Sequence, residues 1–302
     1  NSHNIISIEG VPVYNAAHLL GFFSTFTPSH FSRMSITKNA TASEGYGCIG
    51  GILNMELYDS IPKKTNGEFS VGLMSSQGTI RIPLGKKAAL FTSLRISYLN
   101  LLYSPLLKID DGQLTYTFGD INATYLQKIG KRHTLHIDFY SGIDDAEIKN
   151  PNEKIYFNTQ TTWGNTLGAI HWNYKFNKGD LNQSIYFSGY RNRLSLTGNY
   201  DVRLPSEIYD IGYRSRLTFN KWETGLSIIN HNTTPQAPEH ANSSIVISGT
   251  DNEQHTIEGS IYAKYGGNIF NDIYYDVALK GNLYCDFKGY THTSLNPYAM
   301  IA

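Results

Sequence analysis

Apolar and polar residues alternate along most of the chain, and the alternation restarts after each short polar turn. Within residues 133–143, Ile137 and Phe139 fall on one side of an extended strand, and His136 and Asp138 fall on the other. Later segments repeat the pattern, with charged residues deep within the polar side. A soluble core would not hide such charges unpaired, so we predict that one face meets an apolar phase and the other meets water.

From Glu68 onward the pattern predicts about twelve antiparallel strands and no convincing helix. The predicted strands are 68–75, 77–84, 88–99, 114–129, 133–143, 162–176, 183–196, 206–219, 222–231, 255–265, 273–287 and 295–302. Short turns are expected at 85–87, 130–132, 177–182, 220–221 and 268–272, and longer loops at 100–113, 144–161, 197–205 and 232–254. Long strands with short turns at one end and long loops at the other are typical of an all-β membrane barrel.

The first 62 residues differ from the rest and predict a small mixed α/β unit. "NIISIEGVPVYN" is expected to form a strand and a tight turn, and "AAHLLGFFSTF" (16–26) a short helix that ends before Pro28. "FSRMSITKN" and "GGILNMEL" are expected to form two further strands. We therefore predict two domains, residues 1–62 and residues 63–302.

Composition excludes several classes of protein. The 25 Lys and Arg residues balance the 25 Asp and Glu residues, which argues against a nucleic-acid partner. No apolar run reaches the roughly 18–20 residues of a transmembrane helix. "NSHNIISIEG" lacks the features of a signal peptide, so an exported protein would need a preceding segment. Aromatic residues near strand ends, among them Trp172 and Trp222, favour a membrane interface over an ordinary sheet core.

Glycine and cysteine residues offer weak signals of chemistry. Gly45, Gly47 and Gly50 have the spacing of a dinucleotide-binding loop, but the following "ILNMELY" reads as a strand where that loop needs a helix. We interpret these glycines as a turn. Cys48 and Cys285 lie far apart in sequence and indicate no metal site, and the sequence leaves a disulfide between them open.

Histidine and acidic residues offer two further candidates. His136 and Asp138 share a strand face without a third ligand in reach, and His133 lies in a turn, so polar wall residues are favoured over a metal site. Asp144 and Asp145 could act as paired carboxylates, but we expect a solvated loop there. We predict an absence of catalytic, cofactor-binding and metal-binding residues, and the sequence identifies no individual substrate-binding residue.

The stretch "EGVPVYNAAHLLGFFSTFTP" (9–28) resembles the plug-domain signature of TonB-dependent outer-membrane receptors in the form typical of Bacteroidetes. Glu9 replaces the usual Asp, and Thr27 replaces the usual Asn before Pro28. "ITKNATASEGYGCIGGILNMEL" (36–57) resembles the end of that plug more loosely, with Glu44 where an Arg is typical. "WGNTLGAIHWNYKFN" (163–177) resembles a barrel strand and turn of the same receptors.

The resemblance implies a barrel of about 22 strands with a plug in its lumen. The chain is then expected to be a fragment that holds the end of the plug and about the first half of the barrel. The implied function is binding and active import of siderophore–iron, cobalamin or an oligosaccharide across the outer membrane of a Gram-negative bacterium. Implied partners are outer-membrane lipid, the nutrient, with or without a surface lipoprotein, and TonB, whose contact segment is missing from this chain. The expected ligand-contact regions are loops 100–113, 144–161 and 232–254.

Two other functions are compatible with the strand pattern. A secreted all-β adhesin or carbohydrate-binding module would be soluble, whereas a passive porin is opposed by the plug-like first 60 residues. For the receptor, we expect the short turns to face the periplasm. We also expect an open curved sheet, with strands 68–75 and 295–302 unpaired with each other and residues 1–60 against its concave polar face.

Overall fold

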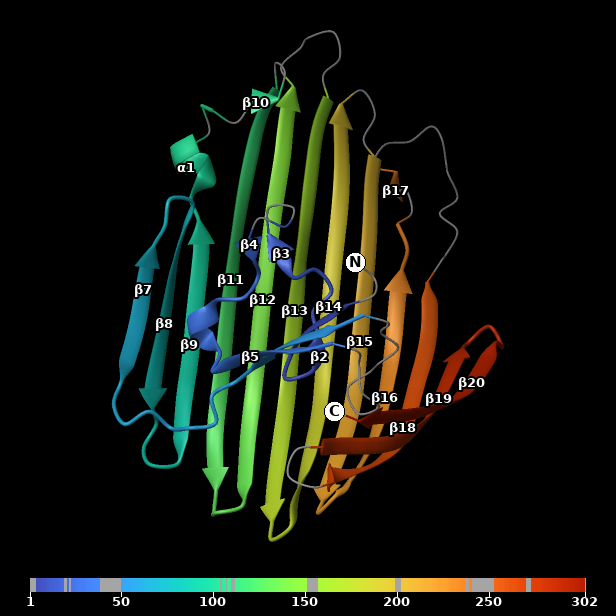
Figure 1. The fold of residues 1–302 in the computed structure, drawn as a ribbon. Helices are drawn as coiled ribbons and strands as arrows, with labels where there is room; N and C mark the ends of the chain where they lie inside the picture. The colour runs from blue at the N-terminus through green and yellow to red at the C-terminus, as the bar shows by residue number, and fades with distance from the viewer. Residues whose placement is uncertain are drawn as a thin grey trace.

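A single curved antiparallel sheet dominates the computed structural model, and a small N-terminal segment lies against one of its faces (Figure 1). The structure describes residues 4–18, 21, 23–38, 50–103, 105–106, 108–109, 112–150, 157–198, 202–236, 239–240, 253–269 and 273–301. Within these residues, the helices are all too short or too polar to cross a membrane.

Twelve strands follow one another across the sheet in sequence order, as the alternation predicted. They are β7 (Asn66–Val71), β8 (Ser75–Pro83), β9 (Ala88–Ser97), β11 (Gly112–Ile129), β12 (His133–Asn150), β13 (Phe157–Phe176), β14 (Gly179–Gly198), β15 (Val202–Phe219), β16 (Trp222–Thr234), β18 (Gln254–Ile269), β19 (Ile273–Asp286) and β20 (Thr291–Ile301). The short strands β10 (Lys108–Ile109) and β17 (Glu239–His240) pair with β11 and β15. A one-turn helix, α1 (Leu99–Tyr103), follows β9.

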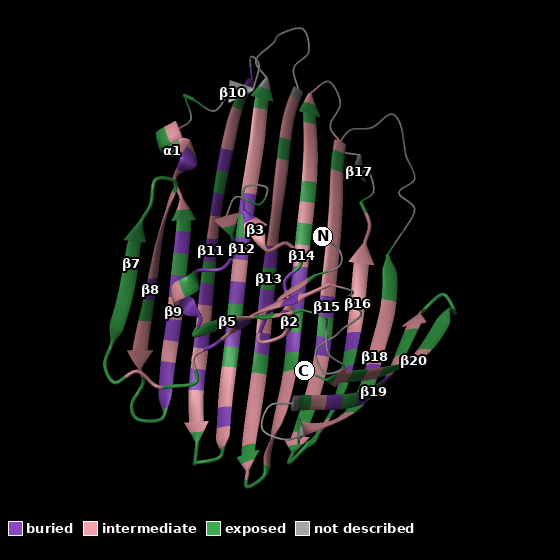
Figure 2. Ribbon diagram, viewed as in Figure 1, coloured by how far each residue is buried: buried purple, intermediate pink, exposed green. Residues whose placement is uncertain are grey.

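The two faces of the sheet differ as the alternation predicted. On β19, Val277 and Leu279 are 55% and 48% exposed, whereas the intervening Ala278 and the preceding Asp276 are 4% and 2% exposed. Figure 2 shows the same banding of buried and exposed residues along the long central strands. The outward face therefore presents large apolar side chains, and the inward face holds the polar ones.

Several strands are longer than predicted, so the expected loops 144–161, 197–205 and 232–254 and the expected turn 177–182 are shorter. The region 144–161 belongs mainly to β12 and β13, which leaves only residues 151–156 between them. Likewise, β16 continues to Thr234 and β14 begins at Gly179, so the turn before β14 is two residues rather than six. Alternation fades near the strand ends, but backbone hydrogen bonds to neighbouring strands continue the ladder.

The sheet is open, as predicted. Its edge strands are β7 and β20, and within the described residues no ladder joins them. Successive connections lie at opposite ends of the strands, so the turns after β8, β11, β13 and β15 gather at one end (Figure 1).

The N-terminal segment, taken as the described part of residues 4–62, forms its own small sheet. Its strand order is β2 (Val11–Pro12), β1 (Ile5–Ile8), β6 (Ile52–Glu56) and β5 (Arg33–Thr37). The predicted helix over 16–26 is wrong in its described residues, because β3 (Ala17–His18) pairs there with β4 (Phe23–Ser24). A short 3-10 helix (Pro28–His30) follows, where proline's fixed φ suits the first turn.

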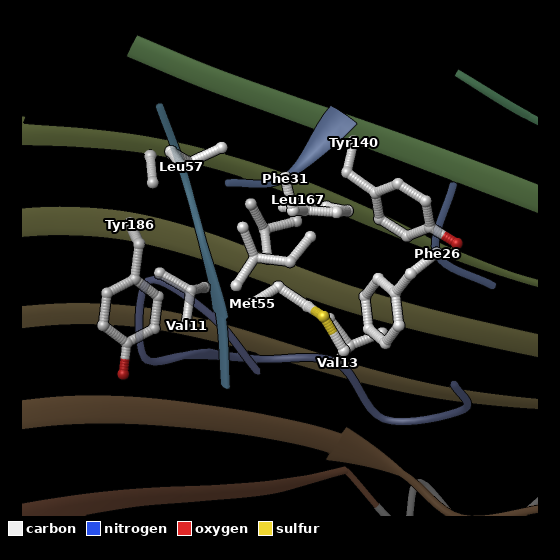
Figure 3. Packing of buried hydrophobic residues seen from close by; sticks show 11 residues of the cluster. Val11, Val13, Phe26, Phe31, Met55, Leu57, Tyr140, Leu167 and Tyr186 are labelled. Carbon is white, nitrogen blue, oxygen red and sulfur yellow. The ribbon is translucent and has the colours of Figure 1, made fainter. Parts of the chain in front are cut away.

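A shared hydrophobic core joins this segment to the inward face of the sheet, as predicted for residues 1–60. Figure 3 shows Phe26 beside Tyr140, and Val11 and Met55 between the segment and the strands. The core residues from the segment are Ile8, Val11, Val13, Phe26, Phe31, Met55 and Leu57, and those from the sheet are Tyr140, Leu167, Ala169 and Tyr186. Each fully buried side chain of this size contributes roughly 1.5–3 kcal/mol, so the segment is held as part of the fold.

Candidate functional site

Residues 12–18, here called the contact segment, connect the N-terminal segment to five strands of the sheet, β11 to β15. The Ser188 hydroxyl donates to the Pro12 carbonyl at 2.5 Å. The Asn165 amide donates to the Asn15 carbonyl at 2.6 Å, and its oxygen accepts from the Asn15 N–H at 3.4 Å. Irregular backbone in the contact segment thus obtains from the sheet the hydrogen bonds that a regular element would supply internally.

At one end of the contact segment, His18 lies between two buried carboxylates. Its Nδ1 is 2.7 Å from Asp144 Oδ2, and its Nε2 is 2.9 Å from Asp120 Oδ1. The ring also stacks on Phe118, with ring centroids 4.5 Å apart. Because β11 and β12 are neighbours, their inward residues can bring one carboxylate to each nitrogen of the same imidazole.

Arg95 and Tyr116 complete this group, which we call the His18 cluster. Arg95 on β9 donates two hydrogen bonds to Asp120, from Nε at 2.6 Å and from Nη2 at 2.9 Å. Its Nη2 also donates to the Ser24 carbonyl at 2.7 Å, and the Tyr116 hydroxyl donates to Asp144. The side chains of Asp120 and Asp144 are 0% and 3% exposed, so both depend on these partners.

The two carboxylates of the His18 cluster favour the protonated form of His18. Burial disfavours a charged His18, but the hydrogen bonds and negative charges of Asp120 and Asp144 outweigh burial and raise the pKa of the imidazole above 6.5. With His18 protonated and Arg95 charged, two positive groups match two carboxylates. The cluster is then a neutral, hydrogen-bonded connection between the N-terminal segment and the sheet.

At the other end of the contact segment, Tyr14 donates its hydroxyl hydrogen to Asp210 on β15. Asp210 is 1% exposed and also lies 2.7 Å from His231 Nδ1 on β16. Burial and the Asp210 carboxylate raise the pKa of Tyr14, so the phenol keeps the proton that it donates. The contact segment is thus held at both ends by a buried carboxylate of the sheet.

A second contact region involves His30 and Tyr58. His30 Nε2 lies 3.0 Å from the Thr124 hydroxyl, and burial together with the positive charge of Arg81 lowers the pKa of His30 to about 4. Tyr58 stacks on Phe91 with centroids 5.3 Å apart, and the guanidinium of Arg81 lies 5.2 Å from the centroid of the Tyr58 ring. Unlike His18, His30 is therefore held in its neutral form.

The turn at Glu9 and Gly10 positions the start of the contact segment. Both residues have positive φ, 46° and 77°, which an L-residue adopts at a cost and glycine does not. The Glu9 carboxylate accepts from the Leu57 N–H at 2.7 Å, which joins this turn to the end of β6. A Cβ on Gly10 would lie 2.4 Å from Nη1 of Arg214 on β15.

Gly10→Ala should destabilise the N-terminal segment by about 1 kcal/mol or more, because alanine strains a positive φ and displaces Arg214. The measurement is the urea midpoint of the detergent-solubilised protein. Gly85→Ala is the matched control, since Gly85 has a φ of 86° and open space around it. Equal losses for the two variants would show that Arg214 contributes nothing.

A polar cavity of about 560 Å³ lies between the small sheet and the strands β12 to β19. Carboxylates of Glu9 and Glu56 border it on one side, and burial raises the pKa of Glu9. Side chains of the sheet that line the cavity include Thr134, His136, His171, Ser184, Arg214, Arg216, Tyr262 and Lys280. Its walls therefore suit a small hydrophilic solute better than an apolar one.

Asp144 and Asp145, which the sequence suggested as a carboxylate pair, lie on opposite faces of β12. The expectation of a solvated loop is wrong for Asp144, which is 2% exposed, points inward from β12 and binds His18. Asp145 points outward and accepts hydrogen bonds from Gln160 and Thr162. Adjacent residues of a strand face opposite sides, so the two carboxylates cannot act as a pair.

The histidines behave as wall residues. His133 begins β12 and stacks on Trp172 and Tyr174, with centroids 5.7 and 4.6 Å away. His136 lies 3.2 Å from the Tyr58 carbonyl, and His171 of β13 lies 3.5 Å from Asp138. In the described part of the chain, groups of three or more side chains arranged to hold a metal ion are absent.

Other sequence candidates lie outside the described residues. These are Gly45, Gly47 and Cys48, whereas Gly50 precedes β6 and Cys285 lies on β19. The residues that sequence reasoning missed are His18, Tyr14, Asp120, Arg95 and Asp210. Isolated inward charges on strands were the only available signal, because His18 and Tyr14 lie about a hundred or more residues from the carboxylates that they contact.

An open wall of long antiparallel strands, apolar outside and polar inside, with a folded segment packed against the polar face, has the architecture of part of a large β-barrel with a folded segment inside it. Neither protein-family models nor curated proteins match the sequence. Solved structures of this fold class match it closely in shape.

The copper transporter OprC matches with a TM-score of 0.68 and 8% identity, over 100% of this chain and 52% of OprC. The FrpB iron transporter from Neisseria meningitidis matches with a TM-score of 0.65 and 14% identity, over 99% of this chain and 54% of FrpB. BauA, the ferric preacinetobactin receptor from Acinetobacter baumannii, matches with a TM-score of 0.64 and 11% identity, over 100% and 54%. Two of these proteins are transporters and the third is a receptor. The chain spans about half of their length, and at these identities the likeness establishes the fold.

Proposed function

We propose that the chain is part of a TonB-dependent receptor that binds a nutrient at the cell surface and imports it through a plugged barrel in the outer membrane. In this proposal residues 1–62 are the end of the plug and residues 63–302 are about the first half of the barrel. The protein binds and gates, and it carries out no covalent chemistry. The plug signature at 9–28 also supports the Bacteroidetes form of the family.

The observation that carries the proposal is the contrast between the two faces of the sheet. Outward residues such as Ile185, Ile211 and Ile261 are 60%, 59% and 61% exposed. Exposure of so many large apolar side chains is unfavourable in water and favourable in lipid. Inward residues such as Asp120 and Asp210 are buried, and each contacts a side chain of the N-terminal segment. A two-faced wall with a folded segment on its polar side supports a membrane barrel with a plug.

The contact segment gives the proposed gating a physical basis. A plug pulled from the periplasmic side must separate Tyr14 from Asp210 and His18 from Asp120 and Asp144 before a path can open. The polar cavity beside Arg214 and Lys280 is the natural place for that path to begin. The loops at the opposite end, within 100–113, 144–161 and 232–254, are proposed to contact the nutrient first.

Fractionation and growth together test the proposal. The full-length protein should sediment with outer membranes and dissolve only in detergent. Deleting its gene should impair growth on one limiting source among iron–siderophore, cobalamin and oligosaccharide, and inactivating TonB should reproduce that defect. Recovery in the medium or the soluble periplasm without detergent would contradict the receptor and favour the secreted adhesin or carbohydrate-binding module.

Orientation in the membrane gives a separate prediction. We expect the turns at 84–87, 130–132, 177–178 and 220–221 to face the periplasm, because short turns lie on that side. Protease added to whole cells should therefore cut within 235–253, the longest connection, and spare the short turns. Mass spectrometry of the released peptides locates the cuts. Cleavage confined to the short turns would reverse the orientation.

A further inference from the structure

Six cations lie in four short turns at one end of the wall. These turns follow β8, β11, β13 and β15 and gather at the same end of the strands (Figure 1). The cations are Lys86, Lys87, Lys131, Arg132, Lys178 and Lys221, and all six are exposed. We call them the turn cations. The four turns, residues 84–87, 130–132, 177–178 and 220–221, contain no aspartate or glutamate.

The carboxylates near the turns already have other cations beside them. Asp180 and Glu223 are the only two within two residues of a turn. Lys175 lies opposite Asp180 in the ladder, Lys264 lies 3.4 Å from Glu223, and Lys128 forms an ion pair with Asp59. Within the described residues, none of the turn cations has an ion-pair partner. This end of the wall therefore carries an excess of positive charge.

The loop end of the wall has the opposite charge. Its connections, residues 104–111, 151–156, 199–201, 235–253 and 287–290, contain seven Asp or Glu residues and three Lys residues. The chain as a whole has a formal net charge of +0, so opposite charges are separated between the two ends of the strands. This separation favours an anionic partner at the turn end.

The turn cations recur at a regular spacing. Neighbouring strands lie about 4.8 Å apart, so these turns recur about every 10 Å, and the four turns span about 30 Å. The sheet is curved, so a flexible linear polymer can follow the arc of turns, whereas a rigid partner would reach fewer of them (Figure 1). Five of the six cations are lysines, which act as point charges and leave the geometry of the anion open.

Aromatic rings place the turns on the water side of the membrane interface in the proposed barrel. Phe176 and Phe219 end β13 and β15 on the outward face, with ring centroids 6.3 Å apart. Trp222 begins β16, and its ring lies 4.9 Å from that of Tyr265. Aromatic side chains favour the interface between lipid and water, so the turns, which come next along the chain, project beyond it. That position favours a partner in the aqueous compartment over the lipid leaflet.

We infer that the turn cations bind a linear polymer that carries carboxylates. The inference rests on the proposed function, because the orientation proposed above places these turns in the periplasm. The carboxylate polymer of that compartment is the peptidoglycan of the cell wall, a glycan with acidic peptides. Each turn contributes one or two cations to successive carboxylates. The receptor is then attached to the cell wall, which import itself does not require.

Sedimentation with purified peptidoglycan tests the inference. The full-length protein in a neutral detergent is mixed with insoluble peptidoglycan, and the bound fraction is measured after centrifugation. The wild type should bind, and binding should fall as salt rises from about 0.1 M to about 1 M, where the screening length shrinks from about 10 Å to about 3 Å. The turn variant, Lys86→Gln/Lys87→Gln/Lys131→Gln/Arg132→Gln, should bind about tenfold more weakly, because four exposed ion pairs are lost.

A matched control removes four exposed cations at the loop end. Lys149→Gln/Arg193→Gln/Arg203→Gln/Lys288→Gln has the same change in net charge and should bind peptidoglycan as the wild type does. A second control converts the carboxylates of peptidoglycan to neutral amides, and the wild type should no longer bind this polymer. Equal binding by the wild type and the turn variant, an equal loss in both variants, or undiminished binding to the amidated polymer would overturn the inference.

Phospholipid retention distinguishes the cell wall from the membrane leaflet. Phosphatidylglycerol bound to the purified protein is counted by native mass spectrometry, and the turn variant should retain as much as the wild type. A loss of phosphatidylglycerol in the turn variant without a loss of peptidoglycan binding would overturn the inference and assign the turn cations to the leaflet.

Failure of the inference can be told apart from failure of the proposed function. A protein that sediments with outer membranes yet does not bind peptidoglycan contradicts only the attachment. A protein that is soluble without detergent contradicts the membrane location itself. Protease cleavage of the short turns on whole cells would contradict the orientation on which the inference rests. Retained strand content by circular dichroism confirms that both variants fold, as expected for exposed side chains.

Discussion

Asp120→Ala should release the N-terminal segment from the sheet. The carboxylate accepts two hydrogen bonds from Arg95 and lies 2.9 Å from His18, with its side chain fully buried. Alanine leaves two buried positive groups without their shared partner, which costs about 3–5 kcal/mol. Hydrogen exchange measured by mass spectrometry should show backbone amides of the contact segment exchanging about a hundredfold faster or more, while β13 and β14 stay protected.

The neighbouring strand offers a control for this variant. Asp145→Ala removes an outward carboxylate that bonds only to the side chains of Gln160 and Thr162 among the described residues, so it should leave the contact segment protected. Unchanged exchange in Asp120→Ala would mean that the hydrophobic core around Phe26 and Tyr140 holds the segment without the His18 cluster. An equal effect of both variants would point to general loosening of the wall.

The central part of the wall was predictable because its two faces meet different surroundings. Between 135 and 143 every outward residue except Ser141 is apolar and most inward residues are polar, so the period of two is visible in the sequence. Beyond Asp144 the outward residues become polar as well, with Asp145 and Thr162 in facing positions. The period then disappears although the hydrogen-bonded ladder continues, which is why 144–161 resembled a loop.

The segment around residues 16–26 was mispredicted for a related reason. Its apolar residues include Ala16, Leu19, Leu20 and Phe23, which have the spacing of one face of a helix. Phe26 packs against Tyr140, and Phe23 packs against Phe118, so the wall surrounds the segment on more than one side. Tertiary contact with β11 and β12 overrides the local preference for a helix.

The candidate site was out of reach of sequence reasoning because its pairs are remote. His18 and Asp144 are separated by 126 positions, and Tyr14 and Asp210 by 196. The sequence shows that a charged residue lies on the inward side of a strand, and a buried charge needs a partner. The sequence does not show which residue is that partner. A folded plug covering the wall was predicted from the motif at 9–28, and only the structure matches each carboxylate to its partner.

The second large effect concerns pH, because two histidines of the N-terminal segment are held in opposite protonation states. His18 faces Asp120, Asp144, Arg95 and Tyr116, and its pKa is raised above the ordinary 6.5. Its stabilising contribution is therefore full below about pH 6.5 and is lost as the pH rises through the raised pKa, where the cluster keeps a net negative charge. His30, beside Arg81, has a pKa lowered to about 4.

For His30 the sign is reversed. Between about pH 4 and pH 6.5 the unfolded segment binds a proton at His30 that the folded segment excludes, so this contribution is lost as the pH falls. Protection of the contact segment should consequently peak near neutral pH and decline on both sides. Hydrogen exchange at several pH values, corrected for intrinsic exchange rates, measures that profile. His18→Gln should remove the alkaline decline and keep the acid one, and His30→Gln should do the reverse. A profile that neither variant alters would contradict both assignments, and loss of the acid decline in His18→Gln would show that the two roles are exchanged.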